Sequence, residues 1–209
     1  IDLGSSRLGW EMATLDYLLG DKLSKATREL IHDNLQRRIF TPYRDMIEDR
    51  RGENGWLRVR NNWNAVCHAG VVGAALATLD SKNDRALFIA AAQYYLPNFI
   101  NGFGADGYCS EGLGYWNYGF GHFIMLTETV RQATGGHTDL LEDPKAGPAT
   151  LFGRRDEMIN GIYPSIADCH PSSKPDPQIT AYICRRMNLS PCDWRREIFV
   201  RPDGSLFTT

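Results

Sequence analysis

The chain has 209 residues, a formal net charge of −2 at pH 7 and five cysteines without a CxxC pair. This length allows one sizeable core rather than two independent ones, and the scattered basic residues form no stripe that would attract nucleic acid. No apolar run approaches the roughly 20 residues that a membrane span needs. We therefore expect one domain that binds neither nucleic acid nor a membrane, and the cysteine spacing argues against a disulfide framework and a zinc site.

Two helices are predicted at the start of the chain. Apolar residues recur at helical spacing over residues 8–19, and Gly20 ends the run. A second helix follows Ser24, a favourable N-cap, and extends to Ile47. Because Pro42 lacks the N–H that a helix interior requires, we expect it to kink or split this second helix.

The next segment begins with a turn cluster over residues 50–55 and a short extended run over 56–60. A third helix covers residues 61–79, in which glycine and alanine occupy positions suited to close packing. A fourth helix covers residues 84–100 and carries Pro97 near its end.

The second half of the chain starts with a glycine-rich loop, which is followed by a fifth helix over residues 115–133. Two further helices are predicted over 148–160 and 177–188, separated by a loop rich in proline and serine over 161–176. Alternating residues around a Pro-Asp-Gly turn predict a β-hairpin over 197–208.

Antiparallel helix pairs joined by short loops favour an all-α fold, best described as an incomplete α/α toroid or solenoid of helical hairpins. We divide the chain into a helical domain over residues 1–196 and the start of a β-sheet domain over residues 197–209. The rest of that β domain is expected to follow Thr209.

Polar residues are concentrated at the start of the third predicted helix. On a helix that begins near Asn61, the side chains of Asn61, Asn64 and His68 share one face, whereas Asn62 points elsewhere. One interpretation is a cluster that binds an anion at the helix N-terminus. The other is an N-cap followed by a buried core histidine, and periodicity alone favours this second interpretation.

A second polar segment covers residues 111–122. Tyr115, Tyr118 and His122 fall on one helical face, and Glu111 lies in the loop before it. A tyrosine here can carry a proton if a neighbouring cation or imidazole lowers its pKa. The alternative is an aromatic stripe that packs in the core. The four glycines of this segment count against it, because glycine is a poor helix former and indicates that the backbone lies close to another part of the protein or to a ligand.

A third pair of residues, Asp168 and His170, could form a carboxylate–imidazole pair on a loop, and an ordinary surface loop is the alternative. The chain contains no GxSxG, P-loop or HExxH pattern. We expect neither a metal nor a cofactor.

The two polar segments, together with Asp106-Gly107-Tyr108, resemble the heparinase II/III-like polysaccharide lyases. The resemblance spans most of residues 1–125 and continues weakly through 163–168. It implies an α/α toroid followed by antiparallel β-sheets, with the substrate cleft between the two parts. It also implies β-elimination in an acidic, uronic-acid-containing polysaccharide such as a glycosaminoglycan or alginate, and a periplasmic or secreted location, although no signal peptide is present at Ile1.

The resemblance also assigns roles to residues. Asn62, or Asn61 or Asn64 in a shifted register, would neutralise the uronate carboxylate, and either Tyr115 or Tyr118 would act as base and acid. Many family members have histidine where this chain has Trp63, so His68, His122 or His170 would take over the proton-handling role of that histidine. The remaining candidate substrate-binding residues are Asn61, Trp63, Asn64, His68, Glu111, Trp116, Asp168 and His170.

Two other functions compete with the lyase hypothesis. A glycoside hydrolase on a similar toroid would use two carboxylates from Asp106, Glu111 and Asp168, held about 5–9.5 Å apart. A non-catalytic carbohydrate-binding fragment would instead stack sugar rings on exposed aromatic residues, for which Trp63, Trp116, Tyr115 and Tyr118 are the candidates.

Overall fold

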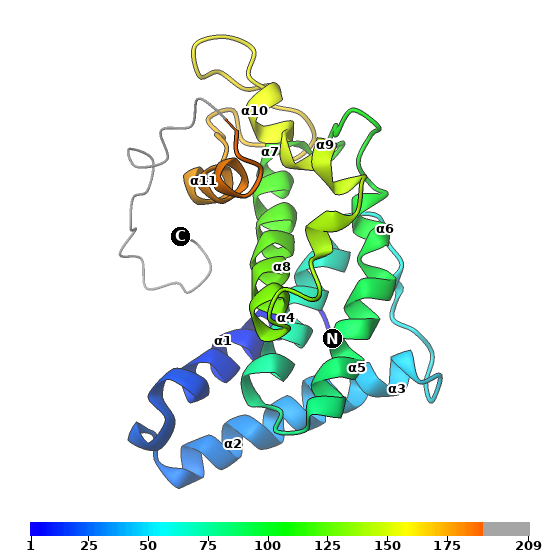
Figure 1. Ribbon diagram of the computed structural model, residues 1–209, viewed down its shortest axis with the longest axis vertical. Helices are drawn as coiled ribbons and strands as arrows, with labels where there is room; N and C mark the ends of the chain where they lie inside the picture. Colours follow the sequence, from blue (N-terminus) through cyan, green and yellow to red (C-terminus); the bar gives the residue numbers. More distant parts are fainter. Residues whose placement is uncertain (190–209) are drawn as a thin grey trace.

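The computed structural model describes residues 1–189, which form helices joined by turns and loops and contain no β-strand (Figure 1). The all-α prediction is therefore confirmed for this part of the chain, while the hairpin and β domain predicted after residue 196 lie outside the described residues. The α-helices are α1 (Leu3–Leu19), α2 (Lys25–Leu35), α3 (Thr41–Ile47), α4 (Asn62–Thr78), α5 (Lys82–Tyr95), α6 (Pro97–Ile100), α7 (Gly112–Tyr115), α8 (Gly121–Ala133), α9 (Ala146–Thr150), α10 (Phe152–Arg155) and α11 (Pro177–Arg186).

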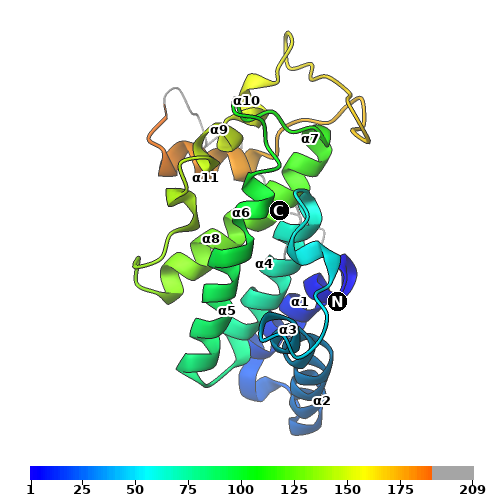
Figure 2. The same ribbon diagram turned by 90° about the vertical axis from the view of Figure 1, so that its right-hand side faces the viewer.

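Helix α4 is the central element of the fold. It packs against α1, α5 and α8, and Figure 2 shows α4 between α1 on one side and α5 and α8 on the other. A Cβ added at Gly70 would overlap the Ser6 carbonyl of α1, and one added at Gly73 would overlap the Trp10 ring. The small residues of α4 therefore serve the close packing that the sequence predicts.

An aromatic cluster fills the core between α3, α4 and α5. The buried ring of Tyr43 stacks on Trp56 with centroids 6.1 Å apart, and it lies 5.2 Å from the ring of Phe88. His68 stacks on Tyr95 at 5.7 Å and meets Trp56 edge-on at 5.0 Å. This cluster surrounds His68 with apolar ring faces, so that the imidazole is fully buried.

Pro42 and Pro97 both follow irregular turns in the helices. Pro42 comes just after a π-helical segment, η2 (Gln36–Phe40), which joins α2 to α3 without leaving helical backbone conformations, so the second predicted helix continues to Ile47 through a wider turn. Pro97 opens α6, directly after Leu96, the C-cap of α5. Because proline lacks the N–H that a regular helix interior requires, an irregular turn before it is expected.

The extended run predicted over residues 56–60 is wrong. Trp56 and Leu57 belong to a 3-10 turn, η3 (Gly55–Leu57), and both side chains are buried. The carboxamide of Asn64 donates hydrogen bonds to the carbonyls of Trp56 and Leu57 at 3.3 and 2.8 Å. These bonds hold the turn against α4, and no periodicity within the segment itself could reveal them.

Two further 3-10 turns, η1 (Gly20–Lys22) and η5 (Leu140–Glu142), end α1 and precede α9. Cys67, Cys109 and Cys169 are buried free thiols, whereas Cys184 is disulfide-bonded. Within residues 1–189, none of the helices combines the length and apolar character required to cross a membrane.

Candidate functional site

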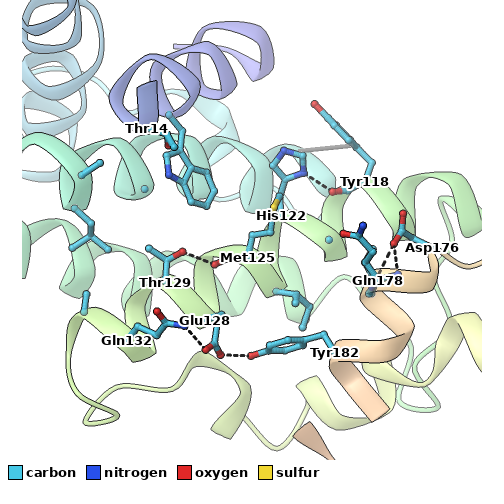
Figure 3. A pocket seen from close by; sticks show the side chains of 18 of the residues that line it. Thr14, Tyr118, His122, Met125, Glu128, Thr129, Gln132, Asp176, Gln178 and Tyr182 are labelled. Atoms are coloured by element: carbon cyan, nitrogen blue, oxygen red, sulfur yellow. Dashed lines mark hydrogen bonds between the residues drawn. The ribbon is translucent and has the colours of Figure 1, made fainter. Parts of the chain in front are cut away.

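A groove of about 800 Å³ opens between α1, α4, α8 and α11. Figure 3 shows Tyr118 and His122 at one end of this groove and Gln132 at the other. Its walls also carry hydroxyl, carboxamide and apolar side chains, and the charged residues that line it within residues 1–189 are Glu128 and Asp176. The groove is therefore lined by two candidate catalytic residues, Tyr118 and His122. No Lys or Arg within residues 1–189 lines it.

Tyr118 and His122 form a close pair at that end. The Nδ1–H of His122 donates to the carbonyl of Tyr118 at 2.7 Å, and the two ring centroids are 4.8 Å apart at an angle of 73°. Because the carbonyl only accepts, the proton of the neutral imidazole resides on Nδ1 and the Nε2 atom carries the lone pair. The pair thus combines a phenol with a proton-accepting ring.

Burial sets the protonation state of both groups. It raises the pKa of Tyr118 above its ordinary value, and the nearby charge of Arg7 offsets part of this rise. Burial also lowers the pKa of His122, although its hydrogen bond to the Tyr118 carbonyl acts in the opposite direction. At neutral pH the phenol is therefore protonated and the imidazole is neutral.

A π-helical segment, η4 (Trp116–Phe120), determines which tyrosine reaches the groove. The segment joins α7 to α8 without a break, so the fifth predicted helix exists but carries a wider turn. A π-turn adds one residue and rotates the following residues around the helix axis. Tyr118 lines the groove with His122, whereas half-buried Tyr115 does not line it.

The two polar segments predicted from the sequence meet at the start of α4. A Cβ added at Gly119 would lie 2.8 Å from the Cβ of Asn62 and 3.0 Å from its Cα, so the backbone of η4 touches Asn62. The Glu111 carboxylate accepts one hydrogen bond from the Asn62 backbone N–H at 3.0 Å and one from its Nδ2 at 2.7 Å. Asn62 is thus enclosed between Glu111 and Gly119, the residue that follows Tyr118 in the sequence.

The other polar residues of α4 have structural roles. The side chain of Asn61 caps the helix by accepting a hydrogen bond from the Trp63 backbone N–H at 3.2 Å. Asn64 is fully buried, and its carbonyl accepts a hydrogen bond from the Nδ1–H of fully buried His68 at 2.7 Å. These three positions match the N-cap and core-histidine interpretation rather than a ligand-binding face.

The two tryptophans among the candidates differ in exposure. Trp63 is 40% exposed at the start of α4, where a ligand can reach it. Trp116 is 1% exposed, donates its indole N–H to the Ala149 carbonyl at 2.9 Å and stacks on Phe120. Trp116 is therefore a core residue, and a sugar could stack on it only if the core opened.

The loop candidates lie apart from the groove. Asp168 is exposed, and exposed His170 shares a hydrogen bond of 2.8 Å with the Ser172 hydroxyl. Asp106 is also exposed and accepts a hydrogen bond from the Tyr108 backbone N–H, which closes a local turn. None of the three proposed hydrolase carboxylates, Asp106, Glu111 and Asp168, lines the groove, and Glu111 is bound to Asn62.

Glu128 and Asp176 also line the groove, although the sequence interpretation does not single them out. Hydrogen bonds from Arg131, and then from Gln132 and Tyr182, lower the pKa of Glu128 to about 2. Asp176 caps α11 by accepting from the backbone N–H groups of its first turn. The sequence could have identified Asp176 as an N-cap, because it directly precedes Pro177 at the first position of a helix. No pattern in the sequence around Glu128 indicates that it lines a groove.

In the part of the chain that the structure describes, no group of three or more His, Cys, Asp or Glu side chains could hold a metal ion. The chain matches no protein-family model, and no curated protein matches its sequence.

Proposed function

We propose that this chain is the helical part, arranged as an incomplete α/α toroid, of a polysaccharide lyase that acts on a uronic-acid-containing polysaccharide. Asn62 contributes to neutralising the uronate carboxylate, and Tyr118 with His122 moves the protons. A β-sheet domain after the helices completes the cleft, and the enzyme is periplasmic or secreted. The reaction requires no metal or cofactor.

The single observation that carries this proposal is the contact between Asn62 and Gly119. It joins a carboxamide at the start of α4 to the segment that holds Tyr118, although the two segments are more than 50 positions apart in the chain. Elimination needs these two functions side by side, because the carboxylate and the C5 proton belong to the same sugar ring.

The proposed chemistry follows from the protonation states. A base removes the C5 proton, the C4–C5 double bond forms, and the bond from C4 to the glycosidic oxygen breaks. The protonated Tyr118 phenol is suited to give a proton to that oxygen, and the neutral imidazole of His122 is suited to take one up. Neutralisation of the carboxylate lowers the free energy of the carbanion-like transition state.

Arg7 brings a positive charge near the proposed site. It lies close enough to Tyr118 and His122 to influence the pKa of both, and its 47% exposed side chain forms an ion pair with Glu11 at 3.5 Å. The groove beyond them carries the carboxylates of Glu128 and Asp176. The proposed site therefore offers its positive charge at the Tyr118 end.

The deciding experiment incubates the protein with glycosaminoglycans, alginate and polygalacturonate and follows the ultraviolet absorbance of the unsaturated uronate. We expect absorbance to increase with at least one polymer, together with equimolar new reducing ends. Arg7→Ala, which lies outside the proton-transfer pair, should raise KM on that polymer more than it lowers kcat. New reducing ends without the double bond would show hydrolysis and overturn the proposal.

A further inference from the structure

The start of α4 already holds an anion, which is the carboxylate of Glu111. One of its oxygens accepts from the first backbone N–H of the helix and the other from the Asn62 carboxamide, at 3.0 and 2.7 Å. Helix N-termini favour negative charge at this position. The place that the sequence pattern suggested for a ligand anion is therefore occupied by a side chain from 49 residues further along the chain.

Both partners of this contact are held by backbone packing. Gly112, directly after Glu111, has φ +79°, and a Cβ at this position would lie 2.6 Å from the Ile166 carbonyl oxygen. On the other side, the backbone of Gly119 presses against Asn62. The backbone contacts on both sides therefore fix the positions of Glu111 and Asn62 relative to each other. Their hydrogen bonds differ in this respect from an ion pair between two flexible surface side chains.

The carboxylate also determines how the carboxamide is oriented. A carboxylate accepts hydrogen bonds but does not donate them, so the Nδ2 atom of Asn62 must face Glu111. The Oδ1 atom then points the other way, where it is buried and accepts no hydrogen bond from residues 1–189. Because the amide is planar, the second Nδ2 hydrogen has only one direction left.

We propose that Glu111 is a positioning residue that holds the Asn62 carboxamide in the orientation required to neutralise the substrate carboxylate. This role rests on the proposed function and gives Glu111 a different task from direct substrate binding. Without the carboxylate, the amide can rotate and present Oδ1 to the substrate, which would repel a uronate. The effect belongs to the transition state, so it should lower kcat more than it raises KM.

The test compares Glu111→Ala, Glu111→Gln and Glu157→Ala in the full chain, on the uronate polymer that gives the largest unsaturated product signal. Glu157 is a matched control because it also accepts a backbone N–H, from Gly161 at 2.7 Å, but in an exposed loop. We expect kcat to fall at least tenfold in both Glu111 variants and to stay within twofold of wild type in Glu157→Ala.

Added formate distinguishes positioning from simple loss of stability. The vacated place in Glu111→Ala can accept a small carboxylate, so formate should restore part of its kcat in a saturable manner. Glu111→Gln keeps the shape of the Glu111 side chain and serves as the second variant in case Glu111→Ala fails to fold. Its carboxamide occupies the place of the carboxylate, so added formate should not restore kcat. All rates are measured well below the melting temperature of each variant, so that a merely less stable protein still shows wild-type kcat.

The outcomes separate this role from the proposed function. An active wild type together with wild-type kcat in both Glu111 variants would overturn the positioning role alone. Formate that raises the melting temperature of Glu111→Ala without raising kcat would also overturn it. A wild type that makes no unsaturated product from any polymer would overturn the proposed function, and the positioning role with it.

Discussion

The imidazole of His122 stands nearly perpendicular to the ring of Tyr118, with 4.8 Å between the centroids, while its Nδ1–H binds the Tyr118 carbonyl. Two contacts between residues four positions apart on one helix thus orient the imidazole relative to the phenol. Both side chains line the groove, at the end where Figure 3 shows Asp176 and Gln178.

The first prediction distinguishes the two tyrosines. Tyr118→Phe should lower the rate of unsaturated product formation by about 10²–10⁴-fold, the usual contribution of a proton-transfer group. Tyr115→Phe should lower it by less than about tenfold, because Tyr115 does not line the groove. Initial rates from ultraviolet absorbance test this order, and the reverse order would move the proton-transfer role to Tyr115.

The second prediction concerns the contact at Gly119. Gly119→Ala places a methyl group 2.8 Å from the Cβ of Asn62, so it should lower the free energy of unfolding by about 1–3 kcal/mol. Gly114→Ala is the control, because its new Cβ would lie 3.9 Å from the nearest atom, in Cys169. Urea unfolding should find Gly114→Ala as stable as wild type or more stable; equal losses in both variants would contradict the predicted overlap.

The third prediction is a pH dependence due to His68. Burial lowers the pKa of His68 to about 4, whereas an unfolded histidine has a pKa of about 6.5. As the pH falls below about 6.5, the unfolded chain binds a proton that the folded chain does not, so stability decreases down to about pH 4. The contribution of His68 to this decrease is about 2–3 kcal/mol between pH 7 and 4.5.

His68→Phe should remove this contribution and flatten the curve of unfolding free energy against pH. His137→Phe, at an exposed imidazole, should leave the wild-type slope unchanged. Urea titrations at pH 7, 6, 5 and 4.5 provide the comparison. Parallel curves for wild type and His68→Phe would show that His68 is protonated in the folded protein.

The fourth prediction concerns the wall of the groove formed by α11. The Tyr182 hydroxyl donates to Glu128 on α8 at 2.8 Å, and the Tyr182 ring also lines the groove. Tyr182→Phe should lower the free energy of unfolding by about 1.5–3 kcal/mol, the usual value for a hydrogen bond to a charged group. Hydrogen exchange should become faster in the peptide that contains α11.

Tyr17→Phe is the control for this change, since Tyr17 lines the same groove but is 72% exposed. Its exchange pattern in α11 should equal that of wild type. Unchanged exchange in Tyr182→Phe would mean that other contacts hold α11 against α8.

Local signals in the sequence determine most of the helices. The third helix is predicted over residues 61–79 and observed as Asn62–Thr78, because Asn61 is a strong N-cap and the small apolar run after it favours burial. The irregularity expected at Pro42 is observed as the π-turn directly before it, since the missing N–H acts within one turn. The first helix begins at Leu3, earlier than the apolar run predicts, because Asp2 and Ser5 form a capping box before that run.

Tertiary structure decided what those helices bring together. His68 is a candidate ligand-binding residue by type, yet only the rings of Tyr43, Trp56 and Tyr95, from three other segments, make it a buried core residue. In the same way, Asn62 and Glu111 can each be identified from their own segments, but their two hydrogen bonds cannot. Caps, prolines and periodicity act over a few residues, whereas burial and pairing depend on contacts between segments dozens of residues apart.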